Sequence, residues 1–220
     1  MGCGASTAST KQAIASAEFS TNKSWSGIAS VSGMLMGVKT GKKGAGQLQD
    51  AAGTVLLNIV PSVGKAYDAC FNEPATGKTV VLVCLNQMGN TFTGKATEWG
   101  IWTAEDSAQT GQPPETTPTG QSMYKFGSLR VQVRLKQTIE YLDPSGKKLF
   151  SAKMISTGCS SMAVVLCDGT DGSSPAAVVD GLGNGTVEET WKATCTFAKG
   201  VDPVVAIIMA VQWMGISGGA

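Results

Sequence analysis

The feature that most constrains the fold is an uninterrupted apolar run near the C-terminus, Val204 to Val211, which follows Asp202-Pro203. Helices favour an acidic N-cap and a proline in their first turn, so we expect a helix here. A helix that is apolar on every side has to be surrounded by protein or lipid. At about a dozen residues, or roughly 18 Å, it is too short to span a bilayer. The economical solution is a β-barrel with this helix inside it, and a β-branched central strand is the alternative.

Short strands are expected from Lys78 onward. The segment Arg130 to Lys136 alternates strictly, so that Val131, Val133 and Leu135 share one face. Its partner is either of two strands that flank the turn Asp143-Pro144-Ser145-Gly146. The other expected strands are Val80–Leu85, Phe92–Thr103, Thr138–Leu142, Lys148–Ile155, Met162–Cys167, Ala176–Val179 and Glu189–Phe197. Short strands with Asp-Gly turns between them favour an antiparallel sandwich or barrel.

Residues 1–76 differ from the rest because they are rich in Ala, Ser and Gly. Within them, Gln47 to Val60 has apolar residues at helical spacing before Pro61, and a second helical turn is expected from Val63 to Cys70. We therefore expect two parts: an arm with short helices over 1–76 and a β-barrel with a central C-terminal helix over 77–220. The expected fold class is mainly β, an antiparallel β-barrel closed around a hydrophobic C-terminal helix with a partly helical N-terminal arm.

The composition excludes several classes of function. Charged residues make up 15% of the chain and the net charge is +1, which gives no electrostatic basis for binding nucleic acid. The sequence has no histidine, which removes Ser-His-Asp and Cys-His catalysis and His-ligated zinc. Its six cysteines show no paired spacing of the kind that metal sites use. We expect a protein that is not an enzyme and needs no metal or other cofactor.

The N-terminal sequence Met1-Gly2-Cys3-Gly4-Ala5-Ser6 matches the pattern for N-myristoylation at Gly2, and Cys3 is placed for palmitoylation. One myristoyl chain gives only marginal binding, about 10⁴ M⁻¹, so stable anchoring needs a second signal. Cys3 supplies one in this interpretation. A weaker contribution is expected from three basic residues facing anionic phospholipid headgroups, namely Lys39, Lys42 and Lys43. The chain is expected on the cytoplasmic face of a membrane, held there by its acyl chains.

The order of antiparallel strands and then Gly200-Val201-Asp202-Pro203-Val204-Val205-Ala206-Ile207-Ile208 resembles the tubby-like superfamily, in particular its LURP-one-related and phospholipid-scramblase branch. The resemblance covers about residues 78–216. It implies a β-barrel closed around a hydrophobic C-terminal helix, a cytosolic protein associated with membranes, and phosphoinositide binding through basic pockets. Three basic residues share one face of a strand and are the candidates to meet phosphates: Arg130, Arg134 and Lys136. The alternative is that they form the solvated face of that strand.

Three classes of function remain open from the sequence, and an enzyme is the least favoured because acid/base residues are sparse and unclustered. Of the remaining two, one is a lipid-anchored binding or scaffold module at a membrane surface, which contacts protein partners through the N-terminal arm and the Gly/Pro/Thr-rich loop over 104–123. The other is a structural subunit of a larger assembly, such as a cytoskeletal, ciliary or capsid-like particle, with the same two segments serving subunit contacts.

Overall fold

The computed structural model describes most of the chain from residue 31 to residue 209. The described residues are 31–35, 46–50, 54–61, 69–87, 89–90, 94–106, 111–132, 138–156, 161–168, 174–183, 191–198, 201 and 204–209. The predictions made for the acylation residues Gly2 and Cys3, for the lysines at 39, 42 and 43, and for Asp202-Pro203 lie outside these residues.

The described elements are almost all antiparallel strands. Their bounds are β1 (Val31–Leu35), β2 (Gly46–Asp50), β3 (Val55–Pro61), β4 (Ala69–Asn72), β5 (Thr79–Gln87), β6 (Thr97–Thr103), β7 (Glu115–Thr116), β8 (Ser122–Gln132), β9 (Thr138–Leu142), β10 (Lys148–Ser156), β11 (Ser161–Asp168), β12 (Pro175–Gly183) and β13 (Trp191–Phe197). They form one sheet with the order β6-β5-β4-β3-β2-β1-β13-β12-β11-β10-β9-β8-β7. The expectation of a mainly antiparallel β fold is confirmed.

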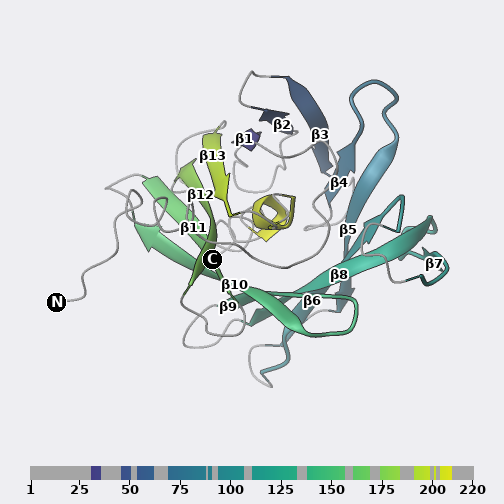
Figure 1. Cartoon of the computed structure of the whole chain (residues 1–220). Helices are drawn as coiled ribbons and strands as arrows, with labels where there is room; N and C mark the ends of the chain where they lie inside the picture. The colour runs from purple at the N-terminus through teal and green to yellow at the C-terminus, as the bar shows by residue number, and fades with distance from the viewer. Residues whose placement is uncertain are drawn as a thin grey trace.

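The sheet is strongly curled, and its strands curve around a short helical segment at residues 204–209 (Figure 1). Every side chain of that segment is at most 2% exposed. A single cluster of buried side chains joins it to strands β3–β6 and β8–β12. The segment 204–209 therefore belongs to the core of the protein. Burying one Ile or Val side chain stabilises the folded state by about 1.5–3 kcal/mol.

The predicted helix from Gln47 to Val60 is wrong, because β2 and β3 occupy this region. Leu57 and Ile59 are buried at a spacing of two, the period of a strand. Strand β3 pairs with β2 on one side and with β4 on the other. Hydrogen bonds to two neighbouring strands and burial of one face outweigh the helical spacing.

The second predicted helical turn, Val63 to Cys70, is wrong at its end, since Cys70 lies in β4. Strand β4 pairs with β5 through Cys70 and Leu82. The expected division between residues 76 and 77 falls in the turn that joins these two strands. The sheet therefore continues from one side of that division to the other.

The strand β8 begins earlier than the alternating segment from Arg130 suggested. It starts at Ser122, inside the expected loop over 104–123, and Lys125 and Tyr124 pair with Trp102 and Thr103 of β6. Val131 is buried and Arg130 is exposed, as the alternation predicted. Val133, Arg134, Leu135 and Lys136 lie outside the described residues.

Two strands and the turn between them follow the prediction closely. Strand β9 has the predicted bounds, and β10 extends the predicted strand by one residue. In the turn, Gly146 has a φ of 86°, a conformation that favours glycine. The Asp143 carboxylate accepts hydrogen bonds from the Ser145 hydroxyl at 2.6 Å and from the Lys147 backbone N–H at 2.9 Å.

Candidate functional site

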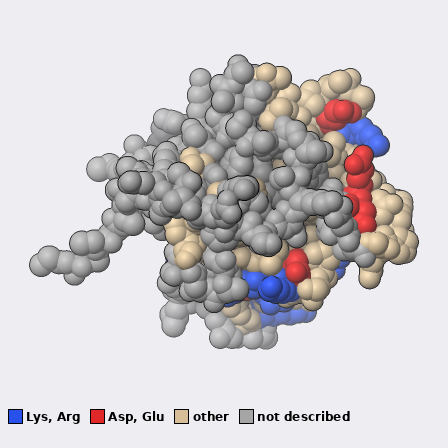
Figure 2. All heavy atoms as spheres, viewed as in Figure 1, with Lys and Arg blue, Asp and Glu red and all other residues tan. Residues whose placement is uncertain are grey.

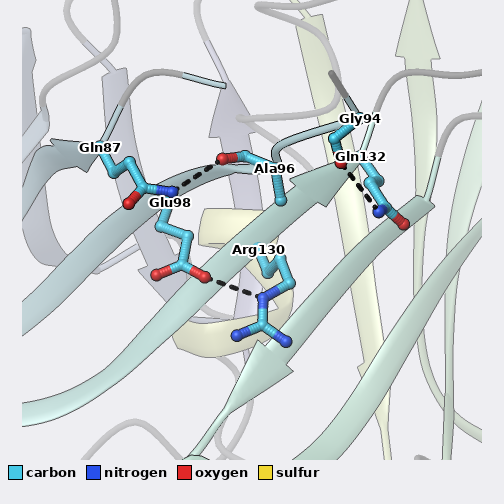
Figure 3. Close-up of polar contacts among 6 residues, drawn as sticks. All are labelled: Gln87, Gly94, Ala96, Glu98, Arg130 and Gln132. Carbon is cyan, nitrogen blue, oxygen red and sulfur yellow. Dashed lines mark hydrogen bonds and ion pairs between the residues drawn. The ribbon is translucent and has the colours of Figure 1, made fainter. Parts of the chain in front are cut away.

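A row of alternating charges crosses four neighbouring strands on the face of the sheet that points away from residues 204–209. Glu98 of β6 lies opposite Arg130 of β8, and Arg130 lies opposite Glu140 of β9. The Arg130 Nε donates to Glu98 Oε1 at 2.8 Å (Figure 3), and Lys148 Nζ of β10 lies 3.5 Å from Glu140 Oε1. We name these four residues the charge row.

Two side-chain amides brace the strand ends beside the charge row. Gln87 Nε2 donates to the Ala96 carbonyl at 3.3 Å, and Gln132 Nε2 donates to the Gly94 carbonyl at 3.4 Å (Figure 3). The first of these bonds lies within the β5–β6 hairpin, and the second ties that hairpin to β8. The backbone that carries Glu98 and Arg130 is therefore held in a fixed register.

The charge row contains two acidic and two basic side chains, so its net charge is zero. The Arg130 and Glu98 side chains are 44% and 31% exposed, so their attraction is screened by water. Exposed ion pairs of this kind contribute about 0–1 kcal/mol. A phosphate that approached Arg130 would compete with Glu98 for the guanidinium.

Three basic side chains on one strand are predicted from the sequence to contact phosphates, and the structure describes one of the three. Arg130 lies in the charge row, while Arg134 and Lys136 lie outside the described residues, as do Gly2, Cys3, Lys39, Lys42 and Lys43. Glu98, Glu140 and Lys148 were not predicted as site residues, because their proximity to Arg130 depends on the strand register.

The concave side of the sheet is filled by the protein's own side chains. Val205, Ile207 and Met209 of the helical segment belong to the same buried cluster as Phe71 of β4 and Ile101 of β6. In the part of the chain that the structure describes, no group of three or more Cys, Asp or Glu side chains is placed to hold a metal ion. Among the same residues, no helix is both long enough and apolar enough to cross a membrane.

A second buried cluster lies on the opposite face of β5, and sequence reasoning missed it. Val81 and Val83 belong to the main core, whereas Leu82 and Cys84 pack with Trp102 and Met123. The continuous apolar run over Val80 to Leu85 carried the signal, since a strand buried on both faces does not alternate. The expected strand over Val80 to Leu85 is confirmed, and both of its faces are covered.

The Trp102 indole of this second cluster lies over a glycine. A Cβ at Gly100 would come within 2.2 Å of the Trp102 ring, so the ring occupies the space that any other residue would need. Residues two apart on a strand share a face. Gly100 therefore leaves room for the Trp102 indole of the second cluster.

No protein-family model matches the sequence, and no curated protein matches it. An X-ray structure of a protein from Arabidopsis thaliana is similar, with 15% sequence identity, a TM-score of 0.45 and coverage of 83% of this chain and 91% of that chain. These comparisons assign no activity to the chain, and the resemblance to the tubby-like superfamily stays a prediction.

Proposed function

We propose that this protein is a non-enzymatic, lipid-anchored binding or scaffold module on the cytoplasmic face of a membrane. Its body is a closed β-barrel of the tubby-like type around a C-terminal helix. The observation that carries the proposal is the burial of residues 204–209 against strands from around the sheet. A barrel filled by its own chain offers its outer surface and its terminal segments to ligands, in contrast to barrels that enclose a small molecule.

The strand pairings support the closed barrel. Strand β6 pairs with β8 as well as with β5, and β1 pairs with β13 as well as with β2. Every described strand except β7 thus has a neighbour on both sides. Closure removes sheet edges, which otherwise invite pairing with other chains.

Membrane attachment rests on the N-terminal sequence. In the proposal, Gly2 carries a myristoyl chain and Cys3 a palmitoyl chain, and together they anchor the protein. Lys39, Lys42 and Lys43 would lie near anionic phospholipid headgroups. Arg130, Arg134 and Lys136 would add contacts to phosphoinositides or other phospholipids. The balance of the charge row makes Arg130 a minor contributor, so the acyl chains dominate the affinity.

Vesicle flotation tests this proposal. The full chain is produced together with an N-myristoyltransferase and a palmitoyltransferase and mixed with vesicles of phosphatidylcholine, with or without a phosphoinositide. The expected result is flotation of the wild type, loss of flotation for Gly2→Ala, and partial loss for Cys3→Ser where palmitoylation has occurred. Arg130→Gln is expected to change flotation by less than twofold, because Glu98 already pairs with the guanidinium.

The alternative, a structural subunit of a larger assembly, predicts a different outcome. Light scattering would show a subunit as part of a large particle, with or without Gly2. Wild-type protein that fails to float and forms such particles would replace the membrane proposal with the assembly one.

A further inference from the structure

The short strand β7 forms the end of an exposed, proline-containing segment. Residues 111–116 are all exposed, and they include Pro113, Pro114 and Glu115. Both ends of the segment are attached to the protein. At one end the Gly111 N–H donates to Asp106 Oδ2 at 2.9 Å, and at the other Thr117 is 3% exposed and its hydroxyl accepts from the Gln121 N–H at 3.1 Å.

The residue types in this segment fix its conformation. Proline locks its own φ near −65°, and a residue that precedes proline is driven to extended or polyproline II geometry. Gln112 and Pro113 both precede a proline. The segment thus enters β7 as a pre-extended stretch, which loses little conformational entropy on binding.

The charged residues next to the segment in the sequence are acidic. Glu105 and Asp106 precede it, Glu115 lies in it, and the first basic residue after it is Lys125. Figure 2 shows acidic side chains on the side of the molecule where β7 lies in Figure 1, with a basic side chain beside them. A partner of complementary charge therefore carries basic residues.

Strand β7 is poorly suited to pair with a strand of a partner protein. Strand β7 has only two residues, and Pro113 and Pro114 before it have no backbone N–H to donate. Their rings and carbonyl groups are instead the features that aromatic grooves recognise in extended proline segments.

We propose that residues 111–116 are a docking segment for a folded domain whose groove is lined by aromatic side chains and rimmed by Lys or Arg. This inference deepens the scaffold role and rests on it, because it names the class of protein that the module would recruit. Glu115 would face the basic rim, while Pro113 and Pro114 would pack against the aromatic rings.

The test is a binding assay of the full chain, carrying Gly2→Ala so that no acyl chain is present, against an array of recombinant proline-recognition domains of the SH3 and WW classes. We expect micromolar binding to one or more domains, and weakening by about tenfold in the double variant Pro113→Ala/Pro114→Ala. Glu115→Gln is expected to weaken binding less and to reduce its dependence on salt. A synthetic peptide covering residues 110–118 should compete.

The matched control is Pro74→Ala, an exposed proline in the turn between β4 and β5. It should bind like the parent protein, and near-ultraviolet circular dichroism should show all variants folded. Absence of binding to every domain, or equal binding of the double variant, would overturn the docking segment. Since the assay contains no membrane, either result leaves the flotation test of the proposed function unaffected.

Discussion

The Tyr141 side chain lies beside two other aromatic residues of the core. Its ring is fully buried, with centroids 6.3 Å from Phe126 and 6.2 Å from Phe150, and its hydroxyl donates to the Phe126 carbonyl at 3.1 Å. Gly127 makes room for it, because a Cβ there would come within 2.7 Å of the Tyr141 ring. The hydroxyl thus adds a side-chain hydrogen bond between β9 and β8, which already pair along their backbones.

Tyr141→Phe removes this hydrogen bond while it keeps the ring in the core. We expect the free energy of unfolding to fall by about 1 kcal/mol, the usual net contribution of one buried hydrogen bond. Urea denaturation followed by tryptophan fluorescence measures the change. The half-buried Tyr124 provides the control, since Tyr124→Phe removes a hydroxyl outside the core. Equal effects of the two substitutions would show that the Tyr141 hydroxyl contributes nothing specific.

Arg130→Gln tests the charge row at the residue scale. Because the Arg130 side chain is 44% exposed, we expect a loss of less than about 1 kcal/mol in low salt. The difference from wild type should shrink further in 1 M salt, where the Debye length is about 3 Å. Lys147→Gln in the turn between β9 and β10 is the matched surface control. A loss of several kcal/mol that persists in high salt would contradict a screened surface pair.

At the scale of elements, the helical segment 204–209 is expected to hold the sheet together. Ile207→Ala should lower the free energy of unfolding by about 2–4 kcal/mol, because it leaves a cavity in a core that contacts strands around the sheet. Val60→Ala is the control, since Val60 is 40% exposed and surface truncations cost about 0.5 kcal/mol or less. If Ile207→Ala were as mild as Val60→Ala, the segment would not be part of the core.

Some elements could be predicted from the sequence, and β3 shows why others could not. Strand β9 was found because its residues alternate and a well-formed turn follows it. In β3, the apolar residues fit both periods: Val55 and Ile59 are four apart, while Leu57 falls midway between them. Only the neighbouring strands β2 and β4 decide between helix and strand, and pairing with distant residues is not visible in a local pattern.

The candidate site was predictable to a smaller extent. Alternation in the sequence correctly placed Arg130 on the exposed side of β8 and Val131 in the core. The partner of Arg130 is Glu98, which lies 32 residues away and is brought near by the pairing of β6 with β8. A one-residue shift of register would move Glu98 to the other face of the sheet, so the sequence alone cannot give this pair.

At the scale of the whole molecule, the proposed closure of the barrel predicts a pattern of hydrogen exchange. If β6 and β8 are joined as the pairings support, their amides are protected on both sides and should exchange as slowly as those of β5. Exchange measured by mass spectrometry or NMR would show this. Fast exchange along Ser128 to Val131, on the side that faces β6, would indicate an open sheet edge between these two strands.

The central proposal, attachment of the protein to a membrane through an acylated N-terminus, is tested most directly by metabolic labelling. Cells expressing the full chain are fed an alkyne analogue of myristate, and the wild type is compared with Gly2→Ala. We predict label on the wild type, none on Gly2→Ala, and a shift of Gly2→Ala from the membrane fraction to the supernatant. Wild-type protein that carries no label and remains in the supernatant would contradict the account.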